Sequence, residues 1–477
     1  MELKKKVLIG FGWNAGAKFL GQLISWSVTI FVMRILQPGD YGLIGIATIF
    51  INFLMLLNEL GLGAALIQKK DLEKDDLSKV FSILLFINIC FFLMLFFAAP
   101  LLGNFFSEPQ AIPIIRVLAI QFLLAPLACI PQSLLFRKMD FKKISIAEIS
   151  SLFMGSSVVF ILALNGAGVW ALVWGNMCIS LLKTIIIAIF SPVFVVPSFS
   201  IKGIAHFLSF GGYITMSSIL WYISVRADSF IVGKFLGKNV LGAYNIAMEF
   251  ASLPLDKVAG ILNQVAFPAY SSIQNNLEDV RSYFLKSIRI ISMIAFPVSW
   301  GMSSVSHELI PVLLGDRWNQ SIIPFQILCF IIPFRLIGSL MSPISLGIGR
   351  PDLNFKTTLF AAIVMPAGIL VGIHWGILGV SLAWVVAYPL VLLMYLDMII
   401  RTIKLSWMSI WANFQMPLIF SAIMYFAVTA ARSVMNANPK SLFHLFILVI
   451  TGVIVYCSLF LNFYKNGCRE LIALVRH

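Results

Sequence analysis

Long apolar runs separated by short polar segments fill this chain. A helix needs about 20 mostly apolar residues to cross the hydrocarbon core of a bilayer, so the pattern predicts about fourteen membrane-spanning helices. The connecting segments are short, and no polar domain or low-complexity tract interrupts the pattern. The predicted spans are 8–36, 42–66, 80–102, 111–135, 144–164, 168–190, 204–235, 241–268, 284–306, 321–346, 357–374, 377–399, 413–432 and 442–464.

Composition supports an all-α polytopic membrane protein. Hydrophobic residues make up 60% of the chain and charged residues only 11%, whereas a soluble domain is about a quarter charged. The basic start at Met1–Lys6 is similar to that of a signal peptide. The apolar segment that follows is too long for one and reaches a turn instead of a cleavage site, so we expect a retained first helix.

The formal charge of +14 is explained by the orientation of the chain in the membrane. Lys and Arg gather in the cytoplasmic loops of membrane proteins, and here they gather in every second loop. This bias predicts that both termini are cytoplasmic. Nucleic acid is not expected as a partner, because no polar domain carries a basic patch. The predicted outer loops hold only Lys234, Lys238, Arg317, Arg432 and Lys440, with Arg34 at an edge.

Two stretches of the chain carry the same pattern between matching apolar runs. Leu36–Ala47 and Leu236–Ala247 share Leu, Gly, Ile and Ala at equal places, and Leu101–Asn104 matches Leu313–Asp316 in the same register. Spans 1–6 and 7–12 are therefore predicted to be two copies, and they are parallel because a six-span unit begins and ends on one side. The predicted parts are an N-lobe at 1–203, a C-lobe at 204–404, and helices 13–14 with a cytoplasmic tail at 405–477.

Charged residues inside the predicted spans are the candidates for function. Each costs about 2.5–3.5 kcal/mol on insertion scales, so such residues face a partner or a water-filled pathway. Taken singly, each charged residue can be explained by a structural role, either in an ion pair between helices or as a side chain that snorkels to the membrane interface. As a set, concentrated in the first two helices of each copy, they predict an aqueous, partly cationic cavity. They are Lys18, Glu59, Arg116, Arg226, Asp228, Glu249, Asp256, Lys257 and Arg335.

The spacing of these charged residues in the sequence indicates which of them share a face of a helix. Glu249 and Asp256 are two turns apart and share a face with Lys257 close by, whereas Arg226 and Asp228 point to different sides. The sequence has no motif for nucleotide hydrolysis, nucleophilic catalysis or metal binding. The sequence lacks a P-loop, a GxSxG turn and metal-ligand spacing, and the six cysteines have no CxxC. We therefore expect no enzyme activity, no cofactor, and packed thiols without disulfides.

Three residue patterns resemble a known family. They are Arg226–Gly237 followed by Leu241–Tyr244, the first-copy turn Leu36–Gly42, and Leu313–Trp318. Together with fourteen spans they are similar to the polysaccharide (O-antigen/teichuronic acid-type) flippases of the multidrug/oligosaccharidyl-lipid/polysaccharide exporter superfamily. The resemblance implies a V-shaped, two-lobed bundle in the bacterial plasma membrane. It also implies a substrate, an undecaprenyl-pyrophosphate-linked oligosaccharide moved from the inner to the outer leaflet.

The resemblance sets further expectations about the mechanism. A cavity with Lys18, Arg226 and Arg335 would receive the anionic pyrophosphate, and spans 13 and 14 would form a groove for the lipid tail. Without a nucleotide site, H⁺ or Na⁺ coupling is the expected energy source. The acids to test as ion carriers are Glu59, Asp228, Glu249 and Asp256. Polymerase and chain-length-regulating proteins are the expected partners besides the lipid bilayer.

Two rival functions stay open at this point. The first is a drug or cation antiporter of the same superfamily, which has twelve spans and an intramembrane acid. The second is a polytopic polysaccharide polymerase or glycosyltransferase, which needs a large outer loop with catalytic groups. The extra spans and the basic set argue against the first, and the short outer loops argue against the second.

Overall fold

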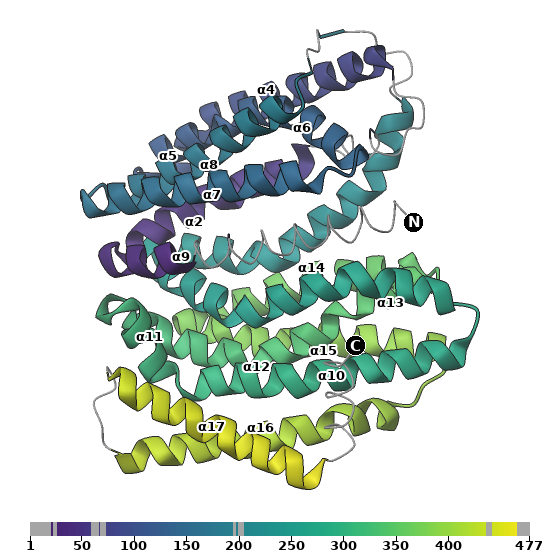
Figure 1. Ribbon diagram of the computed structural model, residues 1–477. Helices are drawn as coiled ribbons and strands as arrows, with labels where there is room; N and C mark the ends of the chain where they lie inside the picture. Colours follow the sequence, from purple (N-terminus) through teal and green to yellow (C-terminus); the bar gives the residue numbers. More distant parts are fainter. Residues whose placement is uncertain are drawn as a thin grey trace. The chain divides into compact units, whose positions relative to one another are not determined.

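The computed structural model describes residues 21, 26–58, 66, 73–193, 197–198, 205–435 and 441–464, without the side chains of 205–217 and 254–265. Every regular element in these ranges is a helix, as predicted for an all-α protein (Figure 1). The α-helices are α2 (Pro38–Asn58), α4 (Lys74–Phe105), α5 (Ala111–Ala119), α6 (Gln121–Arg137), α7 (Phe141–Leu164), α8 (Val169–Phe190), α9 (Ala205–Ile273), α10 (Leu277–Ser304), α11 (Ser306–Leu314), α12 (Ile322–Ser339), α13 (Met341–Gly347), α14 (Pro351–Gly372), α15 (Gly376–Ile403), α16 (Trp407–Met435) and α17 (Leu442–Phe463). Two 3₁₀ helices, η1 (Asp316–Ser321) and η2 (Ile373–Trp375), are also present in these ranges. A shorter apolar helix, Trp26–Ile35, precedes α2.

The helices have the length and surface of a membrane protein. Within the described ranges, 10 helical segments are long and apolar enough to cross a bilayer. Their outward faces carry large apolar side chains, for example Phe97, Val386 and Phe443, which are 70%, 67% and 73% exposed. Contiguous apolar surface of this kind is stable against lipid and not against water. The prediction of a polytopic membrane protein is therefore confirmed.

Helix α9 shows how the predicted boundaries compare with the observed ones. It runs through the predicted spans 204–235 and 241–268 and leaves helical geometry at Gly237, where φ is 79° and ψ is 175°. Glycine adopts this conformation without a clash of Cβ, so the bend falls in the predicted loop. Most of the predicted first span, 8–36, lies outside the described residues.

The helices group into two compact units. Unit 1 is Met1–Tyr222 with Gly233–Gly242, and unit 2 is Ile223–Val232 with Ala243–His477. Each is described by itself below. The lobe boundaries predicted from the repeat stay predictions.

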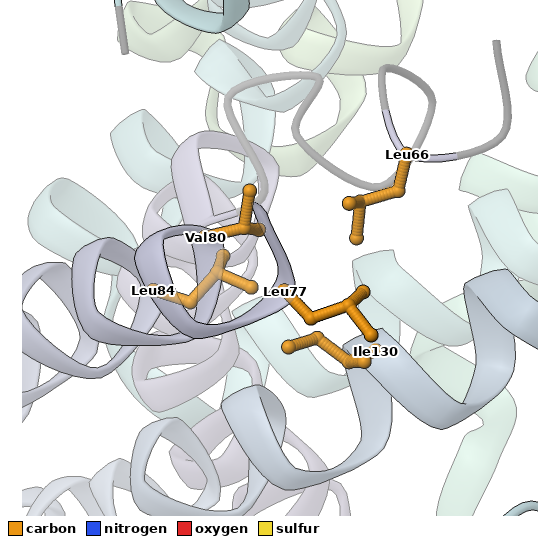
Figure 2. Close-up of a cluster of buried hydrophobic side chains, with 5 residues drawn as sticks. All are labelled: Leu66, Leu77, Val80, Leu84 and Ile130. Atoms are coloured by element: carbon orange, nitrogen blue, oxygen red, sulfur yellow. The ribbon is translucent and has the colours of Figure 1, made fainter. Parts of the chain in front are cut away.

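Unit 1 includes α2, α4, α5, α6, α7 and α8. Helix α4 presents Leu77, Val80 and Leu84 on one face, and they pack with Leu66 and with Ile130 of α6 (Figure 2). The spacing of three and four residues places these side chains on one stripe. Helices α7 and α8 approach closely because of small residues. A Cβ on Gly155 would clash with Ile179, and one on Gly175 would clash with Val159.

Unit 2 repeats this order of packing. Helix α10 packs on α12, α12 on α15 and α14 on α15, as α4 packs on α6, α6 on α8 and α7 on α8 in unit 1. A glycine with positive φ precedes or opens the last helix of each set, Gly168 at 57° and Gly376 at 65°. The same succession of contacts in both units agrees with the predicted two copies of one six-helix pattern.

The two C-terminal helices belong to unit 2. Helix α16 packs on α10 and α17, and α17 also contacts α11. A buried ion pair joins α16 to α11, with 2.9 Å between Arg432 Nε and Glu308 Oε1. Around it lies an apolar cluster of Val305, Met424, Val428, Leu445 and Leu448.

Candidate functional site

Asp228 is a buried carboxylate with three hydrogen-bond donors. It lies on α9 before the bend at Gly237 and is 2% exposed. Its Oδ2 accepts from the Tyr244 hydroxyl at 2.8 Å and from Trp384 Nε1 at 3.2 Å, and its Oδ1 accepts from the Ser229 backbone N–H at 2.5 Å. These donors offset part of the large cost of removing a carboxylate from water.

The donors come from elements far apart in the sequence, all of them in unit 2. Tyr244 follows the bend of α9, and Trp384 lies on α15, so the site forms only when these helices pack. Trp384 Nε1 also donates to the Tyr244 hydroxyl at 2.9 Å, which closes a triangle of three buried groups. Among the described residues, Asp228 has no cation within ion-pair distance. Its hydrogen-bond donors are therefore all neutral, and Arg226 acts on it only through charge at longer range.

Arg335 stacks on the face of the same tryptophan ring. The carbon of its guanidinium is 4.6 Å from the centre of the Trp384 ring, in cation–π geometry. Its Nη1 approaches two neutral groups, Ser252 Oγ at 3.5 Å and Met248 Sδ at 3.4 Å. In the part of the chain that the structure describes, this half-buried arginine has no acidic partner. Its contacts in the described structure are therefore all with uncharged groups.

Helix α15 is shaped to hold the ring beside α12. Trp384 and Tyr388, one turn apart on α15, lie with ring centres 6.3 Å apart. Gly338 on α12 leaves space for Tyr388, because a Cβ at this position would clash with the tyrosine hydroxyl. A small residue on one helix and two aromatic residues on the other thus fix the distance between α12 and α15.

Arg226 and Asp228 point to different sides of α9, as their spacing predicts. Residues that are two positions apart in the sequence lie about 200° apart around the helix axis. Accordingly, Asp228 is buried whereas Arg226 is exposed. Arg226 makes no ion pair or hydrogen bond with the described residues. Glu249 is also exposed. Arg226 therefore interacts with Asp228 through its charge only, whereas Arg335 has no acidic partner among these residues.

The other predicted site residues are not brought to this cluster. Arg116 lies in unit 1, where its Nε donates to the carbonyl of Phe96 at 3.3 Å and its guanidinium stacks 4.8 Å from the centre of that ring. These contacts are structural ones between α5 and α4. Lys18 and Glu59 lie outside the described residues, as do the side chains of Asp256 and Lys257.

Trp384 and Tyr244 are not among the site residues predicted from the sequence, all of which are charged. A signal was present. Trp384 and Tyr388 are two aromatic residues with polar tips, four apart, in the middle of the apolar span 377–399. Such residues need a hydrogen-bond partner when buried, so the pair marked a helix that faces a polar group.

No metal centre is apparent in the described ranges, where no group of three or more His, Cys, Asp or Glu could hold an ion. Cys90, Cys129, Cys178, Cys329 and Cys457 are free thiols, and Cys468 lies outside these ranges.

Comparison with known proteins connects this arrangement to a family. A sequence model described as "Polysaccharide biosynthesis protein" matches residues 31–323, which include Asp228 and Tyr244. The chain belongs to this family.

Individual related proteins are similar to this chain over more residues than the family model matches. The chain is 26% identical to the lipopolysaccharide biosynthesis protein WzxC of Escherichia coli over 430 residues, 88% of this chain and 87% of that one. It is 24% identical to the teichuronic acid biosynthesis protein TuaB of Bacillus subtilis, over 99% and 98% of the two chains. The succinoglycan biosynthesis transport protein ExoT of Rhizobium meliloti is 23% identical over 99% and 96%. These names describe biosynthesis and transport, not catalysis.

Two solved structures show the same fold. The lipid II flippase MurJ in an inward closed conformation matches with a TM-score of 0.75 and 16% identity, over 95% of this chain and 99% of that chain. An inward-facing multidrug resistance transporter of the MATE family, in the MOP superfamily, matches with a TM-score of 0.63 and 18% identity, over 80% and 95%. The family member described here thus has the helical fold of MOP-superfamily transporters.

Proposed function

We propose that this protein is a flippase that moves an undecaprenyl-pyrophosphate-linked oligosaccharide from the inner to the outer leaflet of the bacterial plasma membrane, by alternating access, for synthesis of a surface polysaccharide. Membership of the polysaccharide biosynthesis family supports the substrate class. The observation that carries the proposal is Arg335, a cation within a membrane-spanning unit whose partners in the described structure are an aromatic ring, a hydroxyl and a thioether.

The chemistry of the substrate fits these groups. A pyrophosphate is anionic and needs cationic donors when it leaves water, and Arg presents a fork of N–H groups to phosphate oxygens. Arg335 and Arg226 supply two such groups in unit 2, and Lys18 is a third candidate from the sequence. The lipid tail stays in hydrocarbon, so only the head group and the sugars need a polar path.

Asp228 supplies a second part of the mechanism. A buried carboxylate whose hydrogen-bond donors are all neutral is stabilised when a proton or a sodium ion neutralises it. We therefore assign Asp228 as the leading candidate for ion coupling. Glu59, Glu249 and Asp256 are the further acids to test. The chain's own residues bind and release ions and substrate in this proposal, and no covalent step is needed.

The proposal includes location and partners. Both termini lie in the cytoplasm, as the distribution of Lys and Arg favours, and the membrane is the inner membrane. A polymerase and a chain-length-regulating protein would receive the translocated units. Helices α16 and α17 would form a groove for the lipid tail.

A second candidate is export of drugs or other cations. It is favoured by the fold of the MATE transporter and by the buried acid Asp228, which suits a cationic substrate. Arg335 opposes it, because a cation without an acidic partner among the described residues repels another cation.

Deletion of the gene in the native bacterium tests the proposal. The expected result is loss of surface polysaccharide with accumulation of the lipid-linked oligosaccharide in the inner leaflet, restored by the wild-type gene and not by Arg335→Ala. Arg401→Ala is the matched control, since Arg401 is exposed and pairs with Asp397 at 2.7 Å. Normal polysaccharide with raised drug sensitivity would instead support the exporter.

A further inference from the structure

We propose that Trp384 is a positioning residue that holds the Arg335 guanidinium for the substrate's phosphate groups and links its position to the charge of Asp228. The inference rests on the proposed function and deepens it. It concerns one indole ring that contacts a cation with its face and an acid with its edge.

The face of the ring is the main anchor of Arg335. The guanidinium lies 4.6 Å from the ring centre. Its two other contacts are weaker, because the hydroxyl is distant at 3.5 Å and the sulfur at 3.4 Å is a poor acceptor. Trp has the strongest cation–π attraction of the aromatic side chains. A neutral anchor has a useful property here, since it orients the arginine without neutralising it. An acidic anchor in the same place would compete with the substrate's phosphates.

The edge of the ring fixes its orientation. Trp384 Nε1 donates to Asp228 Oδ2 at 3.2 Å and to the Tyr244 hydroxyl at 2.9 Å. The ring is 3% exposed and lies beside Tyr388, so it has little freedom to turn. The direction of the ring face, and with it the position of Arg335, is therefore set by the acceptors at the edge.

A change of charge on Asp228 must act on this arrangement. A hydrogen bond to a carboxylate is roughly twice as strong as one to a neutral acceptor. Neutralisation of Asp228 therefore weakens one of the two hydrogen bonds that orient the indole edge, and Arg335 is held less firmly on the ring face. The ionisable groups around Asp228 are Arg226 on α9, Tyr244 after the bend, and Arg335 and Tyr388 on α12 and α15, with Glu249 exposed. Binding of an ion and binding of substrate are then coupled through one side chain, and the coupling is reciprocal.

The test uses the purified full chain in lipid nanodiscs and two readouts. The first is the rate at which phenylglyoxal modifies Arg335, followed by mass spectrometry without any substrate. The second is the affinity for undecaprenyl pyrophosphate, with undecaprenol as the probe that lacks phosphate. The variants are Trp384→Leu, which loses face and N–H, and Trp384→Phe, which keeps an aromatic face and loses the N–H.

The matched control is Trp300→Phe. Trp300 lies on α10 of the same unit and also donates its N–H, to the carbonyl of Phe330 at 3.3 Å, but contacts neither Asp228 nor Arg335. The Trp300→Phe variant shows how far the loss of one indole N–H that donates a hydrogen bond changes stability, apart from any effect on Arg335. Thermal unfolding of each variant shows that it is folded.

We expect Trp384→Leu to expose Arg335 to the reagent and to weaken undecaprenyl pyrophosphate binding by about threefold to thirtyfold, the range of a cation–π contact. Binding of undecaprenol should not change. The double variant with Arg335→Ala should be no weaker than Arg335→Ala alone. Trp384→Phe should retain most of the affinity but lose the change of affinity that the wild type shows between about pH 5 and pH 8.

Several results would overturn the inference. One is an Arg335 modification rate in Trp384→Leu equal to that of Trp300→Phe, and another is additive loss in the double variant. Unchanged pH dependence in Trp384→Phe would remove the link to Asp228. If the wild type binds no undecaprenyl pyrophosphate at all, the proposed substrate fails, and the modification rate still decides whether Trp384 holds Arg335.

Discussion

Gly42 and Gly242 occupy equivalent places in the two copies of the repeat, and they pack backbone against backbone within unit 1. A Cβ on Gly242 would lie 2.9 Å from the backbone nitrogen of Gly42 and would clash with the Pro38 carbonyl. A Cβ on Gly42 would clash with the carbonyl of Lys238. The first turn of α2 and the turn of α9 thus meet at a crossing where only glycine fits.

Substitution at this crossing should destabilise the protein. Gly42→Ala and Gly242→Ala force apart two backbone segments that cannot move like a flexible side chain, and overpacking costs about 1–3 kcal/mol or more. Both variants should unfold at a lower temperature than the wild type in detergent. Gly301→Ala is the control, because its Cβ would meet only Met424 Cε at 3.5 Å. Equal stability of Gly42→Ala and the control would show that the two turns are not in close contact.

The ion pair between Glu308 and Arg432 should hold α16 on α11. Glu308 is 1% exposed, so Arg432→Ala leaves a buried charge without a partner, which costs about 3–5 kcal/mol. Arg401→Ala removes an exposed pair of similar length and should cost less than about 1 kcal/mol. Chemical unfolding of the two variants checks the difference. Replacing Glu308 and Arg432 together by Met should restore much of the loss, and failure of this rescue would mean that the charge is not the cause.

His307, next to this pair, should make the protein sensitive to acid. Burial lowers the pKa of His307, the Arg432 guanidinium lowers it further, and Glu308 opposes both effects. The imidazole is therefore held neutral in the folded state. Its contribution is complete above the unfolded pKa of about 6.5 and is lost as the pH falls toward the lower folded pKa.

Because this contribution to stability is lost as the pH falls, His307→Gln should make the protein less sensitive to acid. Between about pH 8 and pH 5 the melting temperature of the wild type should fall more than that of the variant, which has no proton to take up. His374→Gln is the control, since His374 is exposed like His307 but does not lie next to the Glu308–Arg432 ion pair. An equal fall in the wild type and in His307→Gln would assign the acid sensitivity to other groups.

Asp228 should be needed for transport and not for folding. Asp228→Asn keeps the size and the acceptor oxygen but cannot ionise, so the protein should be present at normal levels while surface polysaccharide is lost. Asp228→Ala and Arg226→Ala should have the same outcome. Tyr244→Phe removes one hydrogen bond to the carboxylate, worth about 1.5–3 kcal/mol, and should shift the pH dependence of transport. Wild-type polysaccharide from both Asp228→Asn and Arg226→Ala would remove the two residues from the mechanism.

The sequence predicted the fold better than the site, for a physical reason. Spanning helices follow from length and apolarity alone, because lipid leaves the backbone no other partner, so α4 and α17 were visible as runs. The bend at Gly237 was visible as a break in the second copy of the repeat. The partners of charged residues depend on packing between helices. Arg116 and Arg335 are similar in sequence context, yet one bonds the Phe96 carbonyl and the other stacks on Trp384.

Flipping in proteoliposomes tests the central claim most directly. The measured quantity is the fraction of a fluorescent undecaprenyl-pyrophosphate oligosaccharide that an external quencher reaches over time, in vesicles with the wild-type chain, Arg335→Ala or Arg401→Ala. The account predicts rapid exchange between leaflets with the wild type and with Arg401→Ala, and exchange near the protein-free rate with Arg335→Ala. Equal exchange with the wild type and with Arg335→Ala, or none with the wild type in an imposed proton or sodium gradient, would contradict it.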